Sequence, residues 1–140
     1  MTDLTLNIEK IINAPIEKVF DAWLNPKMLS KIMRRPEMPE SDVENDPRQG
    51  GSFRIIMHKR GEDHPHTGKY LEISRPNKLV FTWASHHSLD DSTVTLNFTK
   101  IDDNKTKISL TQVRFIDEEA RSGHEEGWGI ILVNLNEVMN

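Results

Sequence analysis

Apolar and polar residues alternate along much of the chain, which is the pattern of strands that are buried on one face. In the first such stretch, residues 4–12, Leu6, Ile8 and Ile12 fall on one side at a period of two. In the clearest, residues 93–99, apolar and polar positions alternate without a break. The other strands are predicted at residues 53–58, 67–74, 78–84 and 106–115, with at most a short strand over 41–45.

Two short helices are predicted between the first two strands. Asn13 is a candidate cap and Pro15 suits a first helical turn, and an apolar stripe follows at helical spacing over residues 16–23. Asn25-Pro26 then ends this helix and starts a second one that runs from residue 27 to about 33.

The C-terminal segment predicts one long helix with a single apolar stripe. Its start is open, because Ser122 to Glu125 has capping-box spacing while Asp117 is an earlier candidate. Gly127 lies on the stripe, where glycine costs about 1 kcal/mol relative to alanine. Close approach of another backbone or of a bound molecule would explain that glycine. The stripe is formed by His124, Trp128, Ile131, Leu135 and Val138.

Turn-forming residues mark the loops between the strands, and one strand leaves open whether two of its polar side chains point inward. Residues 59–65 are predicted as a polar loop and residues 102–104 as a hairpin turn. In the strand that follows this turn, an apolar face continues with Gln112 and Arg114. Either a bulge turns both side chains to solvent, or both point inward, where a guanidinium needs an acidic residue or a ligand carboxylate as partner.

This order of elements predicts an α+β fold in which a curved antiparallel sheet of six to seven strands wraps around the C-terminal helix. One helix is about 10 Å wide, whereas six or seven strands spaced ~4.8 Å apart span about 30 Å. The sheet must therefore curl, and a curled sheet leaves a gap beside a straight helix. Such gaps are common binding sites for small molecules.

Composition narrows the class of protein. The length of 140 residues favours one domain over residues 1–140, and the absence of cysteine excludes disulfides and thiolate sites. The net charge of −4, with both signs interspersed, argues against nucleic-acid binding. No apolar run approaches the ~20 residues of a membrane span and the N-terminus has no signal-peptide pattern, so we expect a cytoplasmic monomer or homodimer.

Several short motifs in a fixed order resemble bacterial proteins related to the C-terminal domain of the heat-shock-protein-90 ATPase activator. These proteins belong to the START-like superfamily, also called SRPBCC, which has the helix-grip fold. The motifs are Ala14-Pro15 with Val19, Phe20, Ala22 and Trp23; Asn25-Pro26; Arg48 with Gly50-Gly51, Phe53 and Arg54; Gly68 to Glu72; Leu79 to Trp83; and Gly127-Trp128 with Leu132 and Leu135.

The resemblance implies the helix-grip fold with a cavity between the sheet and the C-terminal helix. Members of the superfamily include lipid carriers, polyketide cyclases, hormone-binding proteins and stress-related co-chaperones. Where the family usually carries a tryptophan pair in the second short helix, this chain has Ile32-Met33. That departure changes the expected shape of the pocket mouth.

Histidines offer the main candidate chemistry. His58, His64 and His66 match no zinc spacing, and Ser85, His87 and Asp90 lack a nucleophile elbow. We therefore expect no metal, no cofactor and no catalytic triad. His124 precedes Gly127-Trp128 on the inward stripe and is either a polar group facing a ligand or a histidine bonded to its own helix.

Three functions follow as hypotheses: binding of a small hydrophobic molecule, interaction with a chaperone, or cyclase- or hydrolase-type catalysis with His124 as the titrating group. Binding without chemistry is favoured, because no convincing catalytic set is present. The tryptophans can serve as core and as ligand platform at once. We expect the ligand to contact Trp23, Phe53, Tyr70, Phe81, Trp83, Gln112, Arg114, His124 and Trp128.

Overall fold

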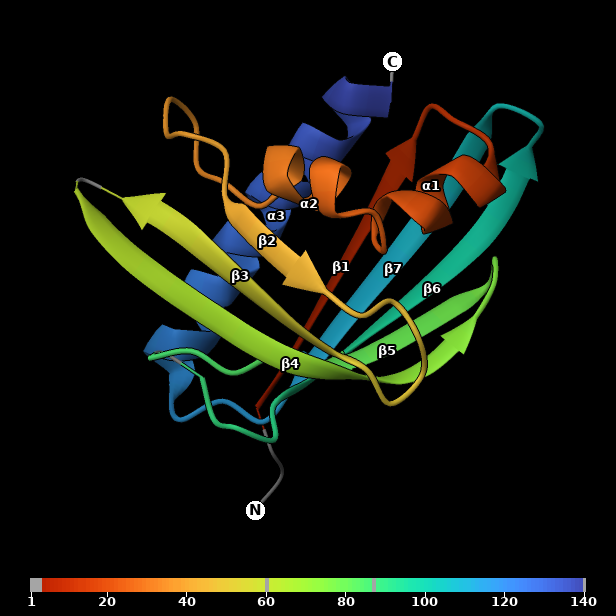
Figure 1. The fold of residues 1–140 in the computed structure, drawn as a ribbon. Helices are drawn as coiled ribbons and strands as arrows, with labels where there is room; N and C mark the ends of the chain where they lie inside the picture. The colour runs from red at the N-terminus through yellow and green to blue at the C-terminus, as the bar shows by residue number, and fades with distance from the viewer. Residues whose placement is uncertain (1–3, 60, 87, 140) are drawn as a thin grey trace.

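A single antiparallel sheet with three helices makes up the described part of the chain (Figure 1). The computed structural model describes residues 4–59, 61–86 and 88–139. The strands are β1 (Thr5–Ile12), β2 (Asp42–Asn45), β3 (Ser52–Lys59), β4 (Glu62–Ser74), β5 (Lys78–Thr82), β6 (Thr93–Asp102) and β7 (Lys105–Val113). The helices are α1 (Ile16–Ala22), α2 (Pro26–Ile32) and α3 (Glu118–Met139).

The strand order is β1-β7-β6-β5-β4-β3-β2, so β1 and β2 form the two edges. Consecutive hairpins join β2 through β7, and the first strand returns beside the last. The ladder between β4 and β5 shifts register between Tyr70 and Glu72. The sheet is strongly bent (Figure 1), as the width of one helix against seven strands requires.

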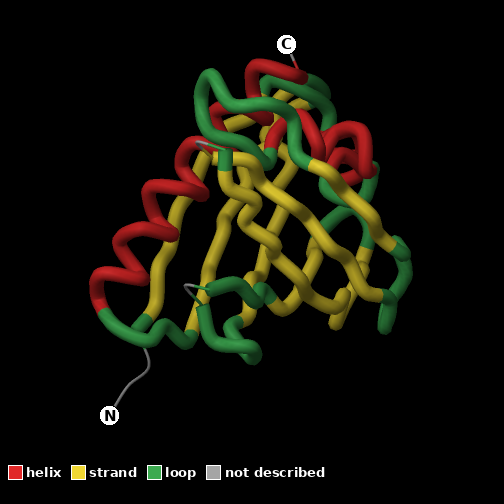
Figure 2. The backbone as a smooth tube through the Cα atoms, turned by 60° about the vertical axis from the view of Figure 1, so that its left-hand side comes forward, coloured by secondary structure: helices red, strands yellow, loops and turns green. Residues whose placement is uncertain are grey.

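Helix α3 runs alongside the strands, and its C-terminal half lies near the short helices (Figure 2). There Asn134 donates hydrogen bonds to the carbonyls of Ile32 and Arg34, each 2.9 Å long. The Asn136 side chain accepts from the Asn13 amide at 2.9 Å. These contacts fix one end of α3, and its first turns lie at the opposite end of the molecule. This is the predicted helix-grip arrangement.

The core follows the predicted faces. The apolar positions of α1 are buried together with Trp23, and the period-two positions of the central strands point the same way. The inward residues of these strands are Leu79, Phe81 and Trp83 in β5 and its extension, Val94, Leu96 and Phe98 in β6, and Ile108 and Leu110 in β7.

Two predicted boundaries are wrong. Residues 62–65 belong to β4 rather than to a loop, and Pro65 lies opposite Ile56 of β3. The proline fits because β4 pairs with β5 only from Tyr70 onward, so this part of the strand needs no amide donor toward β5. Asn13 does not cap α1; Pro15 occupies that position without a side-chain hydrogen bond.

At the other two helices, side chains do cap the first turns. The Asn25 side chain accepts from the amides of Lys27 and Met28 at 2.9 and 3.2 Å. Asp117 Oδ1 accepts from the Ala120 amide at 2.9 Å, so α3 starts at the earlier candidate and Ser122 lies inside the helix. Within the described ranges, none of the helices combines the length and apolar character needed to cross a bilayer.

Candidate functional site

A cleft of about 690 Å³ lies where the first turns of α3 face the tip of the β3–β4 hairpin. The segment after α2 and the loop after β5 complete its walls. The buried residues of α3 begin at Trp128, and the turns before it border the cleft. The lining residues are Arg34, Arg35, Met57, His58, Lys59, His64, His66, Trp83, Ser85, His86, Ile116, Asp117, Glu119, Ala120, Gly123, His124, Gly127, Trp128, Ile130 and Ile131.

The deep wall of this cleft is aromatic. The rings of Trp83 and Trp128 lie with centroids 4.8 Å apart. His66 extends the wall, with its ring 4.9 Å from Trp83 and inclined by only 32°. The side chains of Met57 and Ile131 add apolar surface. Such a surface suits a flat apolar molecule, since stacked and tilted ring contacts add to the burial of area.

Gln112 is buried and sets the position of Trp128. The Trp128 indole Nε1–H donates to Gln112 Oε1 at 2.7 Å, and Gln112 Nε2 donates to Ser92 Oγ at 2.8 Å. Ser92 in turn donates to the Val113 carbonyl at 2.9 Å. The pairing of β7 runs through Gln112 without a bulge, so this side chain points inward as one of the two alternatives predicted.

Arg114 does not share that position, and its expected place in the pocket is wrong. β7 ends at Val113, and Arg114 has a positive φ of 71°, which breaks the period-two alternation. Its side chain is 46% exposed, and Nε lies 3.0 Å from Asp91. The guanidinium therefore reaches solvent beside an acidic residue of its own chain.

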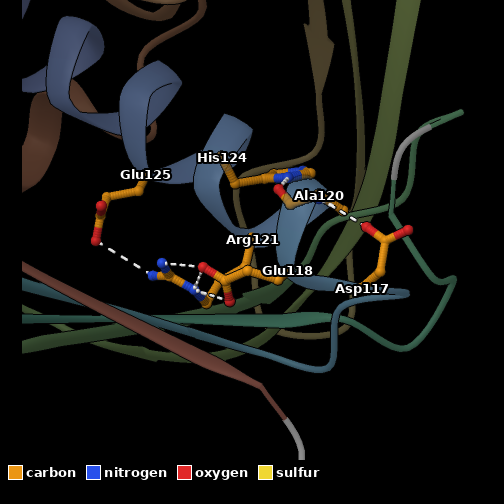
Figure 3. A network of polar contacts seen from close by, with 6 residues as sticks. All are labelled: Asp117, Glu118, Ala120, Arg121, His124 and Glu125. Atoms are coloured by element: carbon orange, nitrogen blue, oxygen red, sulfur yellow. Dashed lines mark hydrogen bonds and ion pairs between the residues drawn. The ribbon is translucent and has the colours of Figure 1, made fainter.

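His124 lies on the cleft and is also bonded to its own helix (Figure 3). Nδ1 lies 2.7 Å from the Ala120 carbonyl and donates its proton there, since a carbonyl only accepts. The ring packs against Phe115 with centroids 5.2 Å apart. One turn away, Arg121 holds Glu118 and Glu125 on the outer side of the helix. The two predicted roles of His124 are thus compatible in one residue.

The histidines of the β3–β4 hairpin differ in electrostatic environment. Burial lowers the pKa of His66 to about 4, although its contacts with the His64 and Ile55 carbonyls favour the charged form. His58 lies between Asp63, 2.8 Å from Nδ1, and Asp42, 3.2 Å from Nε2. Its pKa is raised, chiefly by the hydrogen bond with Asp63.

The inner end of the predicted cavity is packed. The void there measures about 10 Å³, room for one water at most. Of the nine residues predicted to contact a ligand, the structure brings Trp83, His124 and Trp128 to the cleft, while Gln112 lies behind Trp128. The side chains that surround the small void instead include Trp23, Phe53, Tyr70 and Phe81.

Two glycines leave the helical wall of the cleft bare. Gly123 and Gly127 are one turn apart in α3, and a Cβ atom on either would meet nothing within 4 Å. Of the two explanations offered for Gly127, close approach of another backbone is therefore excluded and a bound molecule stays a hypothesis, since the glycine borders open space. The apolar stripe in the sequence singles out Gly127 but not Gly123. The spacing of four residues, which places both on one face of the helix, could have identified Gly123 as well.

The cleft also contains residues that sequence reasoning missed as ligand contacts, notably His66 and Arg35. Both lie where the structure joins segments far apart in sequence, and Arg35 reaches Glu126 of α3 at 3.5 Å. Among the described residues, no group of three or more His, Asp or Glu side chains is arranged to hold a metal ion. His87, named above with Ser85 and Asp90, lies outside the described residues.

Comparison with known structures gives the same fold at low sequence identity. A protein from Mycobacterium smegmatis is 22% identical, has a TM-score of 0.82, and is aligned over 98% of this chain and 91% of its own. A protein from Rhizobium leguminosarum is 28% identical, with a TM-score of 0.82 and coverage of 98% and 94%. An HSP90 activator from Plasmodium falciparum is 25% identical, with a TM-score of 0.73 and coverage of 89% and 87%.

Comparison with curated proteins gave no match. Comparison with protein families matches residues 13–140 to the family described as Activator of Hsp90 ATPase homolog 1-like protein. That match spans both short helices, six of the seven strands and α3. The chain therefore belongs to the family of Activator of Hsp90 ATPase homolog 1-like proteins.

Proposed function

We propose that this protein binds a small hydrophobic molecule in the cleft between the sheet and the first half of α3. The observation that carries the proposal is the cleft itself, because about 690 Å³ falls within the range of roughly 300–1,000 Å³ typical of ligand sites. Its deep wall is formed by Trp83 and Trp128, and polar and charged side chains from the hairpin and from α3 surround that wall. The ligand lies on the indole rings with α3 as its cover.

The bare glycines allow a direct test. In Gly127→Leu the new side chain extends into the cleft, and no existing atom lies within 4 Å of its Cβ to be displaced. Gly129→Leu is the matched control, because a Cβ there also meets nothing and Gly129 does not line the cleft. Both changes improve helix propensity by a similar amount, up to about 1 kcal/mol.

The measurement is thermal unfolding against a panel of lipids and aromatic compounds, with native mass spectrometry of freshly purified protein. A ligand present at 100 times its Kd raises the free energy of unfolding by about 2.7 kcal/mol. We expect this gain in the wild type and in Gly129→Leu but not in Gly127→Leu. Equal gains in all three proteins, or no gain with any compound in the panel, would contradict the proposal.

A second candidate is interaction with a chaperone of the heat-shock-protein-90 class. It is favoured by the family match and by the likeness to the Plasmodium falciparum activator, which is 25% identical over most of both chains. The test is the ATPase rate of the chaperone from the same cell with and without this protein. Stimulation that survives in Gly127→Leu would separate this function from ligand binding, and absence of both binding and stimulation would remove it.

A further inference from the structure

The imidazole of His66 is a half-buried polar group on the wall of the cleft. It continues the aromatic wall, since its ring lies 4.9 Å from that of Trp83 at 32°. Trp128 follows at 4.8 Å from Trp83. The planes of the two indoles are inclined by 54°, so with His66 they form an angled aromatic wall of the cleft.

The hydrogen bond that His66 makes within the chain determines which of its two nitrogens can accept a hydrogen bond from a ligand. Nδ1 lies 2.9 Å from the carbonyl oxygen of His64. A carbonyl can only accept, so Nδ1 carries the proton, and in the neutral ring Nε2 is an acceptor with a lone pair. Across residues 4–59, 61–86 and 88–139, the bond from Nδ1 to His64 is the one hydrogen bond of good geometry that this ring makes, and the ring also lies near the Ile55 carbonyl.

We propose that the cleft takes a flat, uncharged ring compound bearing a hydroxyl or N–H group, which donates a hydrogen bond to Nε2 of His66. This inference rests on the proposed ligand-binding function and names its ligand class. Trp83 and Trp128 give the compound an aromatic wall to pack against, and His66 sets its orientation by accepting from one edge.

A carboxylate is selected against at the same position. It would face the lone pair of Nε2 unless the ring took up a proton, and burial holds the pKa of His66 at about 4. At pH 7 that protonation is unfavourable by about 10³-fold. Asp117 and Glu119 line the cleft and disfavour an anion beside them, whereas Lys59 and His58 line it at the hairpin and favour one.

The guanidinium groups at the cleft are already engaged within the chain. Arg34 donates to the carbonyls of Lys31 and Met38 at 3.2 and 2.9 Å. Arg35 lies 3.5 Å from Glu126. Neither is held ready for a ligand anion, which again favours an uncharged compound.

Three naphthalene derivatives of matched shape test the inference by calorimetric titration at pH 7. These are 2-naphthol, which donates a hydrogen bond; 2-methoxynaphthalene, which does not; and 2-naphthoate, which is charged. We expect 2-naphthol to bind about fivefold more tightly than the ether, which corresponds to one net hydrogen bond. The carboxylate is expected to bind most weakly of the three.

His66→Phe keeps a flat ring beside Trp83 and removes the acceptor, so 2-naphthol and the ether should bind it equally. The ¹⁵N resonance of Nε2 in the wild type gives a readout that needs no variant: it should shift with 2-naphthol and not with the ether. Equal binding of the ether, tighter binding of the carboxylate, or an unmoved resonance overturns the inference and leaves the proposed function standing. If none of the three binds, this inference also fails, and the wider panel decides the proposed function separately.

Discussion

His58 and His66 lie eight positions apart on one hairpin, and their surroundings push their pKa values in opposite directions. His66 is packed against Trp83 and loses solvation, so its pKa falls to about 4. His58 lies at the surface between two aspartates, and its pKa rises. The surroundings thus favour the neutral form of the imidazole in the cleft and the charged form on the sheet.

His66 should make the protein less stable as the pH falls. The unfolded chain takes up a proton near pH 6.5, while the folded state resists it down to about pH 4. Between pH 7 and pH 5 this difference removes about 2 kcal/mol of the free energy of unfolding. Urea unfolding at the two pH values should show that loss in the wild type and a clearly smaller one in His66→Phe. An identical loss in both proteins would contradict the assignment.

Gln112 shows how far the position of one side chain can be predicted from the sequence. Its place on an apolar face predicted that it was either buried or displaced by a bulge, and the unbroken register of β7 shows that it is buried. Its partner Trp128 is 16 positions away on another element. The alternation of β7 could suggest a buried amide, but no local pattern pairs it with an indole on α3.

At the scale of elements, three strands are joined by one side chain. His58 of β3 contacts Asp63 of β4 and Asp42 of β2, with distances of 2.8 and 3.2 Å. Glu62 lies 3.6 Å from His64 nearby, so a further acidic group faces this corner. The protonated imidazole donates to both aspartates and ties the edge strand β2 to the hairpin.

The contribution of His58 has the opposite sign to that of His66. Because its folded pKa is raised, its stabilisation is fully present below pH 6.5 and is lost as the pH rises through the folded value. Thermal unfolding at pH 6 and pH 9 should show a loss in the wild type that is reduced in His58→Asn. Asp63→Asn is the matched control, since it removes the largest cause of the shift and should behave similarly. A pH dependence unchanged in both variants would contradict this account.

Two glycines in different elements should respond in opposite ways to alanine. At Gly68 in β4 a Cβ would lie 2.0 Å from the Thr82 carbonyl oxygen and 2.5 Å from the Phe53 ring, so the strand pairing must shift. Gly68→Ala should cost about 3 kcal/mol of unfolding free energy. Gly123→Ala in α3 meets no atom within 4 Å and should add about 1 kcal/mol. Chemical denaturation measures both, and a neutral Gly68→Ala would disprove the crowding.

The order and type of the elements followed from periodicity, because alternation is strong in β1, β6 and β7 and the α3 stripe is continuous. The boundaries failed where turn-forming residues lie inside regular structure. Pro65 marked a loop, yet it is tolerated in the part of β4 that does not pair with β5. Asn13 resembled a cap, yet its amide donates to Asn136 at the far end of the chain. Partners this far away in the sequence cannot be predicted from the residues around Pro65 or Asn13.

For the whole molecule, the interior is divided into a packed end and an open end. The short helices and the second half of α3 close the first, leaving a void of only about 10 Å³. The first half of α3 stands over the cleft. The sequence predicted which faces turn inward but not how far along the strands the interior is filled. Phe81 and Trp83 share one face, and only Trp83 reaches the cleft.

This division predicts uneven protection of backbone amides. Leu96, Ile108 and Leu110 are fully buried in central strands, so their amides should exchange only on global unfolding. The described residues at the tip of the β3–β4 hairpin, 57–59 and 61–64, lie beside the cleft and should exchange through local opening. Native-state hydrogen exchange measures both sets. Uniform protection over the hairpin tip and the central strands would mean that the open end is as stable as the packed end.

The two edges of the sheet differ in length and charge. β1 offers eight residues, whereas β2 offers four and carries Asp42 and Glu44. Strands this short and acidic resist ladder formation with a second chain, because few hydrogen bonds are gained and like charges meet. Growth of the sheet from one molecule to the next is therefore disfavoured at β2, so the molecule combines an open cleft with one sheet edge that discourages self-association.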